Sequence, residues 1–371
     1  MNSYDLAIVG GGIIGLSHAY AAEQKGLRVL LIEKNERCVG ASIRNFGLIW
    51  PVGQPAGPNF EKAMKSRHLW LKLSKEAGFW CLENGSLHLA YHDDEMNVLE
   101  EYHKEYGHNT ELLNVEQVLM LAKHVNKNGL VGGLYSPLEL NVNPREAVYA
   151  ITGLLEQQDN CDIRTDEKVL HVQTGRLCTT RQEYRADKIL ICSGSDFQSL
   201  YADEFRESNL VNCKLQMMRS SAQHKSFRLG PTLCGGLTLR HYASFRNCRS
   251  LDALKERFHR EMKAYEKWGI HVMVSQNEQN QLIIGDSHEY GYTFDPFNKK
   301  EINDLIIDYM KRFLNVHLLT VEETWYGVYA KNPADTFYVS EPDKNVRIIT
   351  GFGGAGMTLS FGHAMEELES L

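Results

Sequence analysis

Three glycines with the spacing Gly10-x-Gly12-x-x-Gly15 restrict what this chain can fold into more than any other feature. The apolar residues 5–9 before them predict a short buried strand, and residues 14–25 after them repeat apolar side chains at helical spacing. In such a unit the first glycine allows a tight turn, the second lets backbone approach a phosphate, and the third lets helix and strand pack closely. The start of the chain therefore predicts an anion-binding turn in a parallel α/β sheet.

An acidic residue follows at the position that this kind of turn requires. Residues 29–32 predict a second buried strand, and Glu33 stands at its end, eighteen residues after Gly15. The free N–H groups at a helix N-terminus bind phosphate, and a carboxylate at the end of the second strand accepts hydrogen bonds from ribose hydroxyls. Together these features predict a dinucleotide site, because an ordinary glycine turn would leave Glu33 without a role.

A second glycine cluster, near the C-terminus, distinguishes between two dinucleotides. Gly351, Gly353, Gly354 and Gly356 lie between a β-branched strand, 346–350, and a final helix. FAD needs a second binding point far from its adenine end, and a helix N-terminus there would stabilise the negative charge that grows on a reduced flavin. The cluster favours FAD over NAD, with an NAD-binding dehydrogenase as the alternative.

The predicted elements divide the chain into two interleaved domains. The segments 1–85, 141–215 and 326–371 contain the apolar strands and helices of a Rossmann-like, FAD-binding α/β domain. The segments 86–140 and 216–325 contain an expected antiparallel hairpin and an amphipathic helix. They predict a second, α+β domain, built on a mainly antiparallel sheet, which would bind the substrate.

Composition and charge argue against several classes of protein. The 371 residues carry a formal net charge of -7, which argues against a nucleic-acid partner. We see no signal-peptide pattern at the N-terminus and no apolar run long enough to cross a bilayer as a helix. The eight cysteines show neither CxxC pairs nor zinc-like spacing, so we expect reduced thiols, a cytoplasmic protein and no metal site.

Several motifs resemble those of the D-amino-acid-oxidase-type flavoproteins, the family that includes glycine oxidase, sarcosine oxidase and D-amino acid dehydrogenase. The matching segments are DLAIVGGGIIG at 5–15, IEK at 32–34, GASIRNFG at 40–47, NVNP at 141–144, ILICSG at 189–194 and GFGGAGMTLS at 351–360. They span essentially the whole chain. The stretch GASIRNFGLIWPVGQ at 40–54 is most similar to a bacterial subgroup associated with phosphonate metabolism.

The resemblance also implies where the cofactor contacts lie. Residues of the N-terminal turn, of the segment after Glu33 and of the C-terminal glycine cluster would line FAD, and Val169 would contact the adenine through its backbone. The cofactor-binding candidates are Gly10, Gly12, Ile13, Ile14, Gly15, Glu33, Lys34, Ala41, Ser42, Asn45, Gly47, Val169, Ser193, Gly194, Gly353, Gly354, Gly356, Met357 and Thr358.

Three departures from the family pattern bear on the reaction. In the stretch that matches 325–330, sarcosine oxidases carry a cysteine that attaches FAD, and glycine and D-amino acid oxidases carry an arginine that binds the substrate carboxylate. This chain has neither residue there, so we expect non-covalent FAD and a substrate other than a simple α-amino acid. Thr358 stands where sarcosine oxidases keep a lysine that aids the oxygen reaction. We therefore expect slow reaction with oxygen, and the electron acceptor stays open.

The family implies that the C–H next to a neutral amine gives hydride to flavin N5, so the protein mainly orients the substrate. Aromatic side chains can surround a cationic amine, and arginines can bind an anionic head through paired hydrogen bonds. The substrate-binding candidates are Arg219, Arg240, His241, Tyr242 and Tyr329, with the two arginines as the leading anion-binding residues. These features predict oxidation of the C–N bond of a small amine, amino acid or aminophosphonate. The alternative is a non-catalytic or electron-relay flavoprotein.

Overall fold

The first strand lies in the middle of an eight-stranded sheet, where it pairs in parallel with the second strand and with β12. The computed structural model describes residues 3–107, 109–317 and 319–369. The strand order is β10-β11-β12-β1-β2-β9, and β20 pairs with β12 and with β19. The strands are β1 (Ser3–Val9), β2 (Val29–Ile32), β9 (Cys161–Arg164), β10 (Val169–Gln173), β11 (Arg176–Thr179), β12 (Glu183–Ile191), β19 (Tyr338–Asp343) and β20 (Val346–Thr350).

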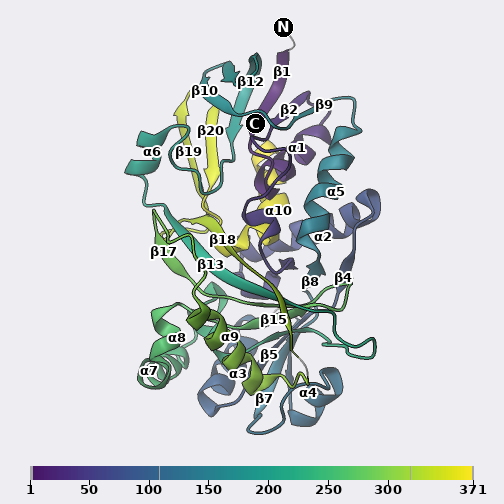
Figure 1. Cartoon of the computed structure of the whole chain (residues 1–371), viewed down its shortest axis with the longest axis vertical. Helices are drawn as coiled ribbons and strands as arrows, with labels where there is room; N and C mark the ends of the chain where they lie inside the picture. The colour runs from purple at the N-terminus through teal and green to yellow at the C-terminus, as the bar shows by residue number, and fades with distance from the viewer. Residues whose placement is uncertain (1–2, 108, 318, 370–371) are drawn as a thin grey trace.

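Both faces of this sheet are covered, which explains why its central strands are apolar at every position. Along β2, Val29 and Leu31 enter one core, and Leu30 and Ile32 enter the core on the opposite face. Helices cover the first of these faces, and they pack against one another around the last helix of the chain (Figure 1). They are α1 (Ile13–Glu23), α2 (Pro58–Ala77), α5 (Pro144–Glu156) and α10 (Gly356–Glu369).

A nine-stranded sheet forms the other half of the molecule, and all its pairs are antiparallel except the pair β14–β5. Its strands are β5 (Ser86–Ala90), β6 (Glu111–Leu113), β7 (Gly132–Ser136), β13 (Val211–Ser220), β14 (Thr232–Cys234), β15 (Met273–Gln276), β16 (Leu282–Gly285), β17 (Glu289–Gly291) and β18 (Val321–Lys331). The helices of this half are α3 (Asp93–Tyr106), α4 (Val115–Leu121), α7 (Leu251–Glu261), α8 (Lys263–Lys267) and α9 (Lys300–Phe313). The predicted combination of a Rossmann-like sheet and a mainly antiparallel α+β half is confirmed.

The long strands β13 and β18 pair along ten positions and run through the middle of the molecule between the two halves (Figure 1). A small sheet of β3 (Leu48–Ile49), β8 (Leu140–Val142) and β4 (Cys81–Glu83) also lies there. The predicted domain boundaries at 215/216 and 325/326 fall inside β13 and β18. The division into domains stays a prediction, and these two strands show where its limits need adjustment.

The strands do not coincide with the apolar runs of the sequence. In β12, Tyr184 and Ala186 alternate with exposed residues and extend the buried face of the strand toward its start. The hairpin strands β15 and β16 are shorter than the apolar runs around them. All eight cysteines are unpaired. Among the helices of the described residues, none combines the length and the apolar character needed to cross a membrane.

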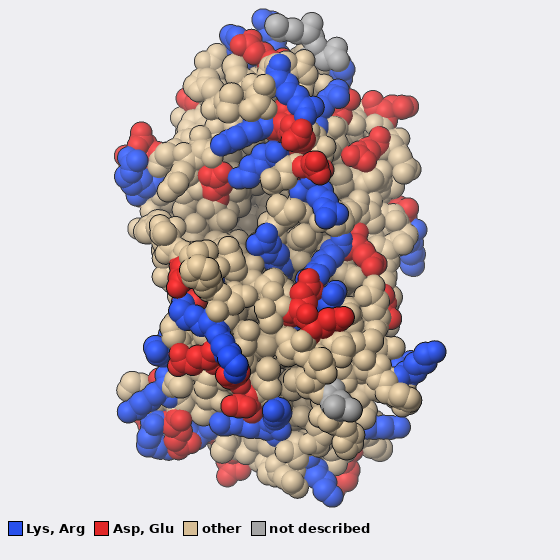
Figure 2. Space-filling model, viewed as in Figure 1, with Lys and Arg blue, Asp and Glu red and all other residues tan. Residues whose placement is uncertain are grey.

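Charged side chains of both signs are mixed on the face of the molecule shown in Figure 2. Lysine and arginine lie among aspartate and glutamate over both halves, and no continuous basic tract forms on that face. This distribution agrees with the acidic excess of the whole sequence.

Candidate functional site

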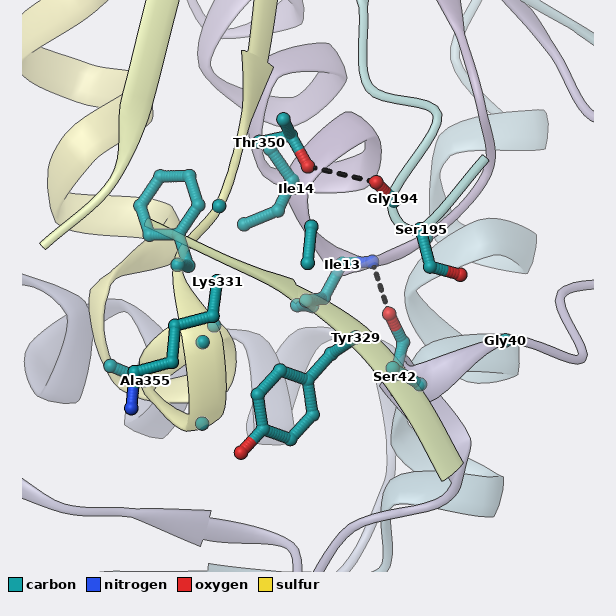
Figure 3. A pocket seen from close by; sticks show the side chains of 18 of the residues that line it. Ile13, Ile14, Gly40, Ser42, Gly194, Ser195, Tyr329, Lys331, Thr350 and Ala355 are labelled. Atoms are coloured by element: carbon teal, nitrogen blue, oxygen red, sulfur yellow. Dashed lines mark hydrogen bonds between the residues drawn. The ribbon is translucent and has the colours of Figure 1, made fainter. Parts of the chain in front are cut away.

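A cavity of about 690 Å³ extends from the first glycine turn to residues of the nine-stranded sheet. Its wall includes the turn after β1, the 3-10 turns η1 (Ala41–Ile43) and η5 (Gly353–Ala355), the loop after β12, and the end of β18. Figure 3 shows side chains from these segments turned toward one space. The cavity has the size of a typical small-molecule site and joins the two halves of the chain.

The three glycines of the first turn meet three different constraints. Gly10 has a φ of +110°, and a side chain there would place its Cβ 2.4 Å from the Cys192 carbonyl oxygen. A Cβ on Gly15 would lie 2.0 Å from the Gly10 carbonyl oxygen, so helix and strand can approach only with glycine there. A Cβ on Gly12 would meet only the Ser42 Oγ, at 3.2 Å. Gly12 is therefore the glycine that leaves room for a ligand against the backbone.

A short turn holds a hydroxyl against the beginning of α1. The Ile13 N–H donates to Ser42 Oγ at 2.9 Å, a bond drawn in Figure 3. The Asn45 amide donates to the carbonyls of Ala41 and Ser42, and its own carbonyl accepts from the Gly47 N–H at 2.8 Å. Asn45 therefore lines the cavity while its hydrogen bonds hold the turn in place.

The Glu33 carboxylate is fixed at the end of β2 by three hydrogen bonds. It accepts from the Gly11 N–H at 2.9 Å, from the Asn35 N–H at 3.0 Å and from the Asn35 amide at 2.9 Å. Lys34 forms an ion pair with Asp196 at 3.0 Å, with its side chain half exposed. Both residues line the cavity, together with Val169, Ser193 and Gly194.

The second glycine cluster stands across the cavity at the beginning of α10. Gly353 has a φ of +57° and a Cβ on Gly356 would find its first neighbour 3.9 Å away, at Ile13. Gly354 is similarly open, with the Tyr329 hydroxyl at 4.0 Å. The Thr358 hydroxyl is buried and accepts from the Trp50 N–H at 2.9 Å, so this bond determines its orientation. The N-terminus of α10 and that of α1 thus line the same cavity.

The substrate-binding candidates divide into two groups. His241, Tyr242 and Tyr329 line the cavity, whereas Arg219 and Arg240 are not part of its wall. Arg219 pairs with Glu323 at 3.1 Å, its partner in the register of β13 and β18, and Arg240 pairs with Glu266. The prediction that these two arginines bind an anion in the cavity does not agree with the structure. Each is held by an acidic residue that is distant in sequence, and sequence patterns do not show such pairings.

Other cations line the cavity, among them Arg44, Arg246 and Lys331. Lys331 follows Tyr329 on the same face of β18, and its chain passes 3.7 Å from the position of a Cβ on Gly353 (Figure 3). Its ammonium donates to the Tyr290 hydroxyl at 3.0 Å, and burial lowers the pKa of Lys331. A lysine therefore does lie beside the second glycine cluster, which weakens the reason for expecting slow reaction with oxygen.

Four ionisable residues form a group in the cavity wall, of which His271, Asp286 and His288 are buried and His241 is partly exposed. The rings of His241 and His271 lie 3.9 Å apart between centroids, those of His241 and His288 lie 4.4 Å apart, and those of His271 and His288 lie 5.1 Å apart. Asp286 Oδ1 lies 3.0 Å from His271 Nε2. Burial lowers the pKa of all three imidazoles, that of His288 to about 4, and raises the pKa of Asp286.

The sequence profile of a protein family described as FAD dependent oxidoreductase matches residues 5–366. The chain belongs to this family. It is therefore an FAD-dependent oxidoreductase, and the family decides the cofactor against the NAD-binding alternative. The match covers the glycine turn, the second glycine cluster and every segment of the cavity wall.

The relatives of this oxidoreductase are named after different substrates. It is 25% identical over 357 residues to a glycerol 3-phosphate dehydrogenase of Caloramator mitchellensis. The aligned region covers 91% of this chain and 67% of that protein. It is 26% identical over 211 residues to a glycine oxidase of Geobacillus kaustophilus. The aligned region covers 52% of this chain and 55% of that protein.

Solved structures show the same fold at lower sequence identity. The glycine oxidase from Geobacillus kaustophilus superposes with a TM-score of 0.79 at 18% identity, covering 100% of this chain and 95% of that one. The L-proline dehydrogenase from P. horikoshii superposes with a TM-score of 0.81 at 19% identity, covering 100% and 94%. The predicted membership of the D-amino-acid-oxidase type is confirmed.

Proposed function

We propose that this oxidoreductase oxidises the C–N bond of a small amine that carries an anionic head group. The observation that carries the proposal is the continuity of one cavity from the glycine turn to Tyr242, Tyr329, Arg246 and Lys331. A ligand in the second part of this cavity would meet aromatic rings and two cations. That combination suits a small molecule with an amine at one end and an anion at the other.

The residues of the first part of the cavity fit FAD. Gly12 leaves open backbone at the beginning of α1, beside the Ile13 N–H that donates to Ser42 Oγ, and a pyrophosphate would bind there. Glu33, fixed by the three hydrogen bonds described above, would accept from the ribose hydroxyls of the adenosine. Gly354, Gly356 and Met357 would lie along the flavin, with the N-terminus of α10 directed at it. Bound FAD supplies the acceptor for the hydride that leaves the substrate carbon.

Arg246 and Lys331 take the anion-binding role in this proposal, in place of Arg219 and Arg240. The Arg246 side chain is exposed, and both Arg246 and Lys331 line the cavity. Burial lowers the pKa of Lys331, and the charge of Arg246 lowers it further. A tetrahedral phosphonate has more oxygens and more charge than a carboxylate and would use both cations. An aminophosphonate therefore fits this wall at least as well as an amino acid.

A second candidate substrate is a phosphorylated alcohol. The similarity to glycerol 3-phosphate dehydrogenase extends over 91% of this chain, a larger share than the similarity to glycine oxidase. The same two cations would then hold a phosphate, and the hydride would leave a carbon that bears a hydroxyl in place of an amine.

Anaerobic reduction of the bound flavin tests both candidates. The panel is 2-aminoethylphosphonate, its N-methyl derivative, glycine, sarcosine, D-alanine and glycerol 3-phosphate, with loss of flavin absorbance as the measurement. We expect an amine with an anionic head to reduce the flavin fastest. Reduction by glycerol 3-phosphate alone would favour the second candidate. If no small molecule in a wider screen reduced the flavin, the electron-relay alternative would replace both.

Variants identify the anion site within this assay. Arg246→Ala and Lys331→Met should each weaken the apparent affinity about 10- to 150-fold, the effect of losing one hydrogen bond to a charged group. Arg219→Ala is the matched control, because its guanidinium pairs with Glu323 and not with the cavity. Equal affinity in the wild type and in both cavity variants would contradict the assigned anion site.

A further inference from the structure

Three histidines from separate segments meet in one part of the cavity wall. His241 follows the 3-10 turn η3 (Gly236–Arg240), His271 precedes β15, and His288 lies between β16 and β17. Each offers one ring nitrogen, and these three atoms all lie within 4.8 Å of one another. Three imidazole nitrogens at this spacing need to move inward by less than about 1 Å to reach a common ion at the Zn–N distance of roughly 2.0 to 2.1 Å.

Hydrogen bonds determine which nitrogen of His288 is available. Its Nδ1 lies 2.9 Å from the Gly269 carbonyl oxygen. A carbonyl oxygen only accepts, so Nδ1 carries the hydrogen and Nε2 keeps a free lone pair. A ring N–H held by a backbone carbonyl is the usual arrangement around a metal-binding histidine, because it fixes both the tautomer and the orientation of the ring.

Nδ1 of His271 is buried without a hydrogen-bond partner among the described residues. Oδ1 of Asp286 has no well-aligned hydrogen bond there either, although it lies 3.0 Å from His271 Nε2. A buried polar atom without a partner is unfavourable, so a native protein normally supplies one. An imidazole nitrogen and a carboxylate oxygen are both metal ligands, and Asp286 also lies 3.9 Å from His288 Nε2. A bound cation would serve all of these atoms at once.

We propose that His241, His271 and His288, with Asp286 beside them, bind a divalent transition-metal ion of the zinc type. Three imidazoles are suited to zinc and its neighbours in the first transition series and poorly suited to magnesium or calcium, which take oxygen ligands. Asp286 either completes the ligand set or orients His271. The site is separate from the residues assigned to FAD. Metal binding at it does not depend on the substrate proposed above, whereas its role in binding an anion rests on the proposed function.

The position of the site gives the ion a role. All four residues line the same cavity as Tyr242 and Tyr329. A zinc ion with three protein ligands keeps a position open for water or for an oxygen of a ligand. The ion would therefore bind an anionic oxygen of a molecule in the cavity, as a third positive group beside Arg246 and Lys331. No change in the oxidation state of the ion is involved.

Metal titration of the FAD-loaded protein tests the site. Tag-free protein is dialysed against a chelator, exchanged into metal-free buffer and titrated with zinc chloride by calorimetry. We expect one zinc ion per chain. His271→Gln and His288→Gln should each weaken zinc binding at least 100-fold, and Asp286→Asn should weaken it about 10- to 100-fold, as loss of a supporting carboxylate does. The matched control is His224→Gln, an exposed histidine that contacts Ser226, which should bind zinc as the wild type does.

Two further measurements keep the test decisive if a variant folds poorly. Retained flavin absorbance and circular dichroism identify the variants that are folded. X-ray absorption at the zinc edge of the wild type should show nitrogen ligands at about 2.0 to 2.1 Å with the multiple-scattering signal of imidazole. A wild type that binds no zinc, or zinc binding that is equal in all variants and the control, would overturn the proposal. In that case water molecules alone satisfy the two buried atoms.

Discussion

At the scale of single residues, surroundings decide what the polar groups of this oxidoreductase can do. Arg219 and Lys331 both lie on long strands of the same sheet, yet only Lys331 lies in the cavity wall. Arg219 is neutralised by Glu323, its cross-strand neighbour, whereas burial lowers the pKa of Lys331 beside a tyrosine. The sequence shows both cations and cannot show their neighbours, because strand register depends on pairing between distant segments.

Two glycines of the first turn should respond differently to the same substitution. Gly12→Ala should leave the apoprotein folded, because its Cβ would meet only a hydroxyl at 3.2 Å, and should weaken FAD binding by obstructing the pyrophosphate. Gly15→Ala should destabilise the protein itself, because its Cβ would overlap the Gly10 carbonyl oxygen at 2.0 Å. Thermal unfolding of the apoproteins and FAD titration by fluorescence quenching measure the two effects. Equal unfolding temperatures in both variants would contradict the assignment of the packing role to Gly15.

Anion binding in the cavity should depend on pH through Lys331. Burial lowers the pKa of Lys331, so its ammonium loses the proton at a pH below its usual value of 10.5. We expect the affinity for an anion to be full at neutral pH and to fall as the pH rises through this lowered pKa. Methanesulfonate is a suitable probe, since its charge is constant between about pH 6 and pH 10, where lysines of lowered pKa titrate.

Flavin absorbance reports the binding of this probe. Lys331→Met should bind it weakly at every pH and show no such decline. Lys65→Met, which removes an exposed lysine paired with Glu366, is the control and should behave as the wild type. A wild-type affinity that stays constant throughout the range would show that Lys331 does not contact the anion.

At the scale of elements, a local sequence pattern predicts a helix or strand where the residues of that element alone determine its structure. The strands β2 and β20 and the amphipathic helix α9 lie where the apolar patterns of the sequence predicted them. The order of strands in the nine-stranded sheet was not predictable from local patterns. The partners of β13 are β16, β17 and β18, and all three lie far from it in the sequence. The histidine cluster depends on that order, which is why the sequence suggested no metal site.

One buried carboxyl connects three separate segments of the chain. Glu139, between β7 and β8, accepts from the Val52 N–H at 3.0 Å and from the Ser86 hydroxyl at 3.0 Å. Burial raises the pKa of Glu139 from 4.5 to about 7. The folded state therefore holds this proton more tightly than the unfolded state does. The resulting stabilisation is complete below about pH 4.5 and is lost as the pH rises to about 7.

Substitution of Glu139 tests this linkage. Between about pH 4.5 and pH 7 the free energy of unfolding of the wild type should fall relative to that of Glu139→Gln, by about 3 kcal/mol if the full shift is expressed. The measurement is urea unfolding of both proteins at several pH values. Glu366→Gln, a half-exposed carboxyl in a surface ion pair, serves as the control and should show no comparable decline. Parallel pH profiles for the wild type and Glu139→Gln would contradict the raised pKa.

At the scale of the whole molecule, the cavity exists because the two sheets meet along β13 and β18. The end of β18 brings Tyr329 and Lys331 to the glycine cluster before α10, and η1 brings Ser42 to α1 (Figure 3). Most of the residues predicted to contact the cofactor lie in this wall, because the glycines and Glu33 are positioned by their own local turns. The substrate half was only partly predictable, because its residues come from loops whose positions depend on the second sheet.

Whether FAD is attached covalently depends on which nucleophilic side chains line the cavity. Residues 325–330 of β18 contain no cysteine, and the cysteines that do line the cavity are Cys38 and Cys192. Burial raises the pKa of Cys38 to about 11 and that of Cys192 to about 12, so both are thiols at neutral pH and poor nucleophiles. We therefore expect FAD to be bound non-covalently. Precipitation with acid should release all of the yellow colour into the supernatant, with the absorbance spectrum of free FAD. Colour that stays in the pellet of the wild type and is lost in Cys38→Ser or Cys192→Ser would identify a covalent bond and contradict the prediction.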